Sequence, residues 1–129
     1  MDYAELLAQA REAAGKAYAP YSGFKVGAAL LTADGKIITG ANIENVSYGL
    51  SICAERVAFF TAVAGGERKF EAIAIAADAR ATPCGACRQV MAEFAPGADV
   101  VTEGEDGVME VKKVANLLPD AFQFKKSGS

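Results

Sequence analysis

The segment that most constrains the fold is an almost uninterrupted apolar run from Phe70 to Ala77. A strand that packs on one side only alternates apolar and polar residues, whereas a strand covered on both faces is apolar throughout. Segments with helical periodicity, 52–64 and 84–94, lie before and after this run. We therefore expect an α/β domain with three layers, α/β/α, built around a mixed five-stranded sheet.

Hydrophobic periodicity and turn residues place the remaining elements. Leu6, Leu7 and Ala10 share one face of a first helix, which Asp2 and Glu5 begin with a pattern like a capping box. In chain order, we predict a helix over 2–17, a hairpin of strands 26–32 and 36–43, a helix over 52–64, a strand over 70–77, a helix over 84–94, strands over 99–102 and 108–114, and a helical turn over 117–122. Residues 1–129 should form a single domain in which 125–129 is a frayed tail.

Length and charge exclude several classes of function. The chain has 129 residues and a net charge of −3, without the basic stripe that long nucleic acids or anionic membranes require. It has no apolar run near the ~18 residues of a membrane span, and its first residues lack the features of an export signal. An odd number of cysteines at metal-like spacing then indicates a reducing, cytoplasmic location.

The predicted helix over 52–64 is apolar on nearly every side, and such a helix must be buried on every side. A domain of this size has little room for that, so we expect a partner subunit to cover its outer face. The alternative is a monomer in which the sheet and neighbouring helices enclose it.

All three cysteines lie in two short motifs, Cys53-Ala54-Glu55 and Pro83-Cys84-Gly85-Ala86-Cys87, and the chain contains no histidine. Structural zinc sites normally have four protein ligands, whereas catalytic sites use three and keep a position for water. Cys84 and Cys87 share one helix face, and Cys53 begins another helix. The pattern predicts a catalytic zinc site with one Zn²⁺ per subunit.

Two other interpretations of the cysteines remain open at this point. They could be unrelated buried thiols, since free cysteine is often buried. Cys84 and Cys87 could instead form a redox pair, which would leave the Cys53 motif unexplained.

The residues that follow Cys53 suit a site of this kind. Glu55 is the candidate proton shuttle, because a carboxylate among apolar walls has a raised pKa and the chain has no histidine to take this role. Its alternatives are a fourth zinc ligand or an ordinary carboxylate at a helix start. Arg56 is the candidate partner that offsets the negative charge of three thiolates; its alternative is a surface arginine.

These motifs closely resemble the small, homotetrameric, all-cysteine class of cytidine deaminases, whose zinc chemistry includes a glutamate that is not a ligand. The resemblance extends over most of residues 18–122. It also includes these segments: Tyr18-Ala19-Pro20-Tyr21-Ser22-Gly23-Phe24-Lys25-Val26-Gly27-Ala28-Ala29, Asn42-Ile43-Glu44-Asn45-Val46-Ser47-Tyr48 and Leu117-Leu118-Pro119-Asp120-Ala121-Phe122.

The resemblance implies a role for each matching residue. Cys53, Cys84 and Cys87 match the zinc ligands, and Glu55 matches the proton shuttle. The resemblance implies that Asn42 and Glu44 contact the ribose and that Phe24 packs on the pyrimidine. It implies that the Ala54 backbone contacts the base edge and that the Thr82 carbonyl faces the departing amino group. Tyr48 and Phe122 match residues that complete a neighbouring subunit's pocket.

The resemblance therefore implies hydrolytic deamination of cytidine and 2′-deoxycytidine in pyrimidine salvage. The implied assembly is a cytoplasmic homotetramer with pockets shared between subunits, acting on a small nucleoside rather than on nucleic acid or at a membrane. The alternatives are a deaminase of another cytosine-bearing molecule, similar to the blasticidin S deaminases, and a non-catalytic protein in which zinc only joins the helices.

Overall fold

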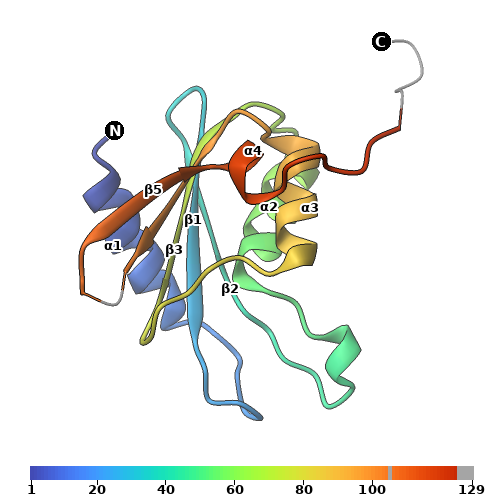
Figure 1. The fold of residues 1–129 in the computed structure, drawn as a ribbon. Coiled ribbons are helices and arrows are strands. Elements are labelled where there is room, and N and C mark those ends of the chain that lie inside the picture. The colour runs from blue at the N-terminus through green and yellow to red at the C-terminus, as the bar shows by residue number, and fades with distance from the viewer. Residues whose placement is uncertain (105, 125–129) are drawn as a thin grey trace.

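A computed structural model describes residues 1–104 and 106–124, and within these ranges a five-stranded sheet lies between two layers of helices (Figure 1). The strands run in the order β2-β1-β3-β4-β5 across the sheet. Helix α1 covers one face, and α2 and α3 cover the other. This arrangement confirms the predicted three-layer α/β class.

The predicted elements recur with small shifts at their ends. In chain order they are α1 (Tyr3–Ala14), β1 (Val26–Thr32), β2 (Ile37–Ala41), a short 3₁₀ turn η1 (Tyr48–Leu50), α2 (Ala54–Ala64), β3 (Phe70–Ala77), α3 (Gly85–Phe94), β4 (Asp99–Glu103), β5 (Met109–Lys113) and α4 (Val114–Leu117). None of the helices in the described residues has the length and apolar character needed to cross a membrane.

Strand pairing explains why the sheet is mixed. β1 pairs antiparallel with both β2 and β3, so β2 and β3 run in the same direction and α2 connects them by crossing over β1. α3 makes the second crossover, because β4 lies parallel to β3. β5 then returns antiparallel to β4. Both crossovers bring the start of a helix to the same end of the sheet.

Helix α1 is attached to its face of the sheet by apolar packing and by a polar contact. Leu6 and Ala10 are fully buried against small residues of β1 and β3. The Asp2 side chain accepts a hydrogen bond from the Ala4 amide and begins the helix. The Tyr3 hydroxyl donates to Asp99 on β4 at 2.7 Å.

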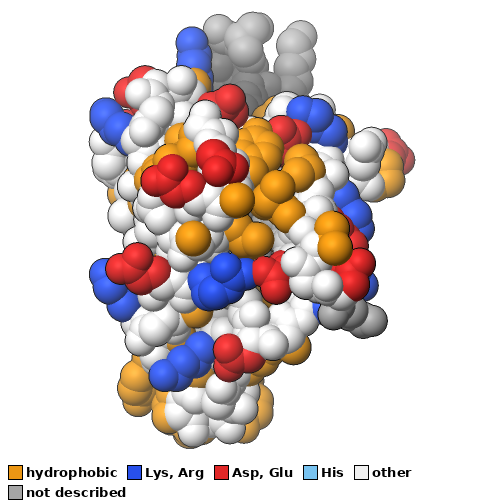
Figure 2. All heavy atoms as spheres, turned by 90° about the vertical axis from the view of Figure 1, so that its left-hand side faces the viewer, with side chains coloured by type: hydrophobic (Ala, Val, Ile, Leu, Met, Phe, Trp, Pro, Cys, Tyr) orange, Lys and Arg blue, Asp and Glu red, His pale blue; other side chains and the backbone are white. Residues whose placement is uncertain are grey.

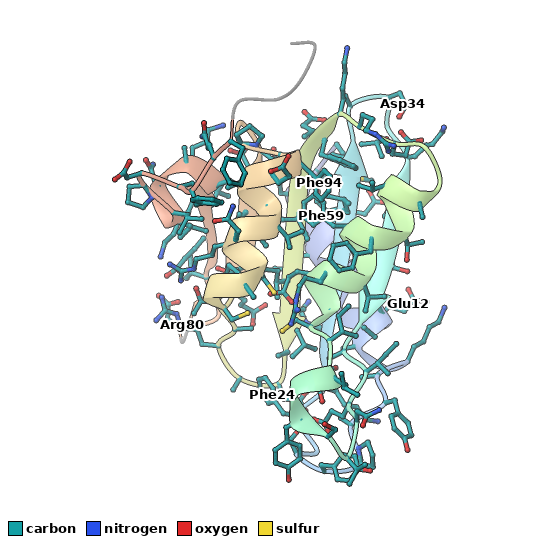
Figure 3. All side chains as sticks on the ribbon, turned by 90° about the vertical axis from the view of Figure 1, so that its right-hand side faces the viewer. Glu12, Phe24, Asp34, Phe59, Arg80 and Phe94 are labelled. Atoms are coloured by element: carbon teal, nitrogen blue, oxygen red, sulfur yellow. The ribbon has the colours of Figure 1, made fainter. Side chains whose placement is uncertain are left out.

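The opposite layer centres on Phe59 of α2. Its ring lies 5.3 Å from the Phe70 ring and 6.3 Å from the Phe94 ring of α3, measured between centroids. Figure 3 shows Phe59 and Phe94 between the two helices. This apolar contact fixes α2 and α3 side by side.

Gly40 brings α2 into direct contact with the backbone of β2. A Cβ atom at position 40 would lie 2.5 Å from the Ala54 carbonyl oxygen and 2.6 Å from the Ala58 amide nitrogen. Any side chain would therefore displace the first turn of α2, which carries Glu55 and Arg56. A glycine in β2 thus sets the position of the residues that follow Cys53.

The structure differs from the sequence prediction at the chain's last helix. The helical turn predicted over 117–122 lies instead over Val114–Leu117. Leu118 precedes Pro119 and has non-helical torsion angles, φ −142° and ψ 71°, because the proline ring disfavours the helical conformation in the residue before it. The predicted tail, 125–129, falls outside the described residues.

We predict that Gly40→Ala destabilises the fold by about 3 kcal/mol or more, because its methyl group overlaps backbone atoms that cannot rotate away. Zinc content should fall with stability, since the first turn of α2 must move. Chemical unfolding and metal analysis measure both effects. Gly97→Ala is the control, because a Cβ atom at position 97 has no atom within 4 Å; equal stability of the two variants would contradict the prediction.

Candidate active site

Three sulfur atoms meet where α2 and α3 begin. Cys53 is the residue that caps the N-terminus of α2, Cys84 caps that of α3, and Cys87 lies in the first turn of α3. The Cys53 and Cys84 Sγ atoms are 3.9 Å apart, and those of Cys84 and Cys87 are 3.4 Å apart. All three sulfurs lie within 4.8 Å of one another.

These separations fit a single zinc ion. Tetrahedral zinc with Zn–S bonds of about 2.3 Å places its sulfur ligands about 3.8 Å from one another. In the described part of the chain, this is the one cluster of at least three histidine, cysteine or acidic side chains that could hold a metal. A set of three sulfur ligands matches a catalytic site better than a closed structural one.

The surroundings of Cys53 favour the thiolate form that binds metal. Cys53 and Cys84 lie at helix N-termini, where the backbone amides favour negative charge. The Arg56 Nη2 atom donates to Cys53 Sγ at 3.5 Å. The contact with Cys87, aided by Arg56, lowers the pKa of Cys53 to about 5, and the same contact raises the pKa of Cys87. Arg56 thus lies where it can offset the thiolate charge.

Glu55 is almost completely buried, with 5% of its surface exposed. It lies in the first turn of α2, two residues from Cys53. Burial raises the pKa of its carboxyl group, and the nearby Cys53 thiolate raises it further. A raised pKa makes the carboxyl group a stronger base than an exposed glutamate, as a group that accepts a proton and later releases it requires.

A cavity of about 540 Å³ opens beside the sulfurs. Most of the residues predicted to contact substrate line it: Phe24, Asn42, Glu44, Tyr48, Ala54 and Thr82, together with Cys53, Glu55, Arg56 and Cys84. Phe24 lines the cavity and lies below the start of α2 and α3 in the view of Figure 3. The fold therefore gathers residues from five separate segments around one space.

Asn42 and Glu44 shape the end of the cavity that the sequence assigned to the sugar. The Asn42 side chain accepts a hydrogen bond from the Val26 amide and donates to the Phe24 carbonyl oxygen. The Glu44 carboxylate accepts from the amides of Tyr21 and Ser22, at 2.9 and 3.1 Å, and from the Ser22 hydroxyl. The hydrogen bond from the Ser22 hydroxyl lowers the pKa of Glu44, which keeps it ionised.

These two side chains are therefore part of the local structure, as well as candidates for substrate binding. Each retains capacity for further hydrogen bonds, since a carboxylate has about four acceptor sites and an amide nitrogen has a second hydrogen. Their predicted contact with a sugar stays a prediction.

Tyr48 and Phe122 differ in their position. Tyr48 lines this chain's own cavity, is 76% exposed and packs edge-on against Tyr21. Phe122 lies outside the cavity on the segment after α4, where its carbonyl oxygen accepts from Gln89. At 67% exposed, Phe122 is available to another chain.

Several cavity residues were not predicted from the sequence. Ser51 and Ile52 precede Cys53, Ile75 comes from β3, and Arg80 and Ala81 precede Thr82. The Arg80 guanidinium lies 3.8 Å from the Glu110 carboxylate on β5. Proximity to Cys53 and Cys84 in sequence was the available signal for most of them, whereas the contribution of Ile75 depends on the sheet.

Comparison with known proteins places the chain in a family. A family profile described as the cytidine and deoxycytidylate deaminase zinc-binding region matches residues 1–103. The chain belongs to this family. The sulfur cluster is accordingly its zinc site, with one ion per chain.

Individual relatives agree with this assignment. The chain is 51% identical over 125 residues to a cytidine deaminase of Sporosarcina psychrophila, covering 95% of this chain and 92% of that protein. It is 52% identical over 125 residues to one of Halalkalibacterium halodurans, covering 95% of each. The crystal structure of cytidine deaminase from Burkholderia pseudomallei superposes with a TM-score of 0.90 at 51% identity, covering 95% of this chain and 100% of that chain. The resemblance inferred from the motifs is confirmed.

We predict that replacing any one of Cys53, Cys84 and Cys87 by alanine reduces zinc from one ion per chain to a small fraction, because two sulfurs hold zinc much more weakly than three. Metal analysis after gel filtration measures the stoichiometry. Ser51→Ala is the control, since Ser51 lines the same cavity without a sulfur. Retention of stoichiometric zinc by a cysteine variant would remove that residue from the ligand set.

Proposed function

We propose that this chain catalyses hydrolytic deamination of cytidine and 2′-deoxycytidine to uridine and 2′-deoxyuridine, with release of ammonia. The observation that carries the proposal is the buried Glu55 carboxyl group beside three sulfurs at the wall of a cavity. The chain's membership of the deaminase family supports deamination as the reaction at this site.

Zinc, when bound by Cys53, Cys84 and Cys87, supplies a Lewis acid that activates water for attack on C4 of the pyrimidine. Glu55 takes the proton released by that water and transfers it to N3 of the base. It then carries the proton of the oxygen newly bonded to C4 to the amino nitrogen, and the bond between C4 and that nitrogen breaks to release ammonia; the glutamate of zinc deaminases acts as a general acid and base in this way. Its raised pKa suits a group that must alternate between base and acid.

The other cavity residues orient the substrate around Glu55. In this proposal, the Ala54 backbone binds the base edge and the Thr82 carbonyl oxygen accepts from the amino group. Phe24 packs against the pyrimidine, and Asn42 and Glu44 bind the sugar hydroxyls. The ionised state of Glu44 supports the last role, because a carboxylate is a strong acceptor for a diol.

We predict that Glu55→Gln lowers kcat for cytidine by about 10³-fold, the range expected for loss of a general acid–base group. Zinc content and unfolding temperature should stay unchanged, since glutamine has the same shape and Glu55 is not a ligand. Loss of absorbance of cytidine measures turnover.

Glu71→Gln provides the matched control, because Glu71 is exposed on β3. Full turnover by Glu55→Gln would exclude the proton shuttle. Inactivity of the zinc-loaded natural chain on both nucleosides would exclude the function itself.

The proposed assembly is a homotetramer. The outer side of α2 supports it: Val57, Phe60, Thr61 and Ala64 follow one another at helical spacing, and Phe60 is 43% exposed. A second subunit on this face would bury Phe60. Phe122, which lies outside its own chain's cavity, would then be able to complete a neighbour's pocket.

We predict that Phe60→Lys shifts the native mass from tetramer to smaller species, because a buried aromatic side chain contributes about 2 kcal/mol or more to an interface. Native mass spectrometry measures the change. Val108→Lys is the control, at a position that is 59% exposed in the turn before β5. An unchanged mass for Phe60→Lys would exclude this face of α2 from the interface.

The proposed setting is pyrimidine salvage in the cytoplasm. The three cysteines form no disulfide, as expected in a reducing compartment. On the face that carries α1 and β5, acidic and basic side chains are interspersed and no basic stripe forms (Figure 2). This face therefore offers no continuous positive charge to a polynucleotide.

A further inference from the structure

Residues 78–84 form one wall of the cavity and connect β3 to α3. Arg80, Ala81, Thr82 and Cys84 all line the cavity from this segment. Within the described residues, 78–83 make no backbone hydrogen bond to another part of the backbone. Since this wall carries a zinc ligand and a proposed substrate contact, other groups must hold its position.

The Arg88 side chain provides that support. From the first turns of α3 its guanidinium group reaches back to the segment: Nε donates to the Pro83 carbonyl oxygen at 2.8 Å, and Nη2 lies 3.3 Å from the Thr82 hydroxyl. Its third nitrogen, Nη1, donates to the Leu117 carbonyl oxygen at 3.0 Å.

The third contact anchors the guanidinium group to a separate part of the fold. Leu117 ends α4, and α4 is attached to the core through Val114, which is 1% exposed. Arg88 therefore connects a segment without regular structure to two helices. The three hydrogen bonds leave in different directions from one rigid, planar group, which lysine cannot reproduce.

We infer that Arg88 is a positioning residue that fixes the Thr82–Pro83 backbone so that the Thr82 carbonyl oxygen meets the amino group of the substrate. This inference rests on the proposed deamination. Arg88 is separate from Arg56, which contacts the thiolate of Cys53. Arg88 acts on the segment that precedes Cys84, through the backbone, and need not touch the substrate.

The test compares Arg88→Lys with Arg68→Lys in zinc-loaded protein. Arg68 also donates to two backbone carbonyl groups, those of Val63 and Glu67, at the far end of α2. Arg88→Lys should lower kcat/KM for cytidine by about 30-fold, within the range for groups that orient a catalytic site. Arg68→Lys should leave it unchanged.

A nucleoside without the amino group separates positioning from general damage. The ribonucleoside of pyrimidin-2-one carries hydrogen where cytidine carries its amino group, so its binding does not use the Thr82 carbonyl oxygen. Its inhibition constant should change by less than about 2-fold in Arg88→Lys, given that effects at separate contacts are additive. Zinc content should stay at one ion per chain.

The rate of proteolysis within residues 78–84 tests the support from Arg88 without measuring activity. Trypsin cleaves after arginine, and the Arg80 side chain is 45% exposed within the segment. Cleavage after Arg80 should be at least about 3-fold faster in Arg88→Lys than in Arg68→Lys, because a segment released from its support opens more often.

Each contrary outcome overturns the inference. Loss of zinc in Arg88→Lys would mean that Arg88 supports the metal ligand Cys84 instead. Equal weakening of cytidine and of the pyrimidin-2-one nucleoside would mean a general structural role, and normal kinetics with unchanged cleavage would mean no role. If the natural zinc-loaded chain does not turn over cytidine, that result excludes the proposed function, and with it the role of Arg88 in that function.

Discussion

The site depends on the convergence of two helix N-termini at one end of the sheet. Cys53 and Cys84 each precede a helix, and their sulfurs come within 3.9 Å because α2 and α3 both start at that end. The two crossovers of the mixed sheet produce this convergence, and Gly40 sets how closely α2 approaches it. Both helix ends favour the negative charge that three thiolates concentrate.

Around this centre, hydrogen bonds from side chains add to the backbone hydrogen bonds that hold the cavity walls. The Asn42 side chain forms hydrogen bonds with the backbone of Phe24 and Val26. The Glu44 carboxylate accepts from the amides of Tyr21 and Ser22. The Arg88 guanidinium group bonds to the Pro83 carbonyl oxygen and the Thr82 hydroxyl. Such walls present backbone carbonyl and amide groups to a ligand while staying in place. Polar residues of this kind can therefore serve the structure and the reaction together.

The sequence predicted most elements because their apolar patterns are local. β1 and β3 have the predicted bounds, since each run is apolar and ends at clear turn residues. The final helix was misplaced because Leu118, before Pro119, ends it earlier than the apolar spacing indicated. The sulfur cluster was predictable from spacing, but the contributions of Arg80 and Ile75 to the cavity were not, because no motif contains them.

The sequence by itself indicated the cluster of three cysteines, the acidic residue two positions after Cys53, and the α/β class, because these depend on residue type and short-range spacing. Only the tertiary structure decided which distant segments share the cavity wall and which side chain supports each of them. Arg88 lies next to a zinc ligand in sequence, yet its contact with Leu117 joins residues 29 positions apart. Contacts of that kind arise from how helices pack across a sheet, which local sequence patterns do not encode.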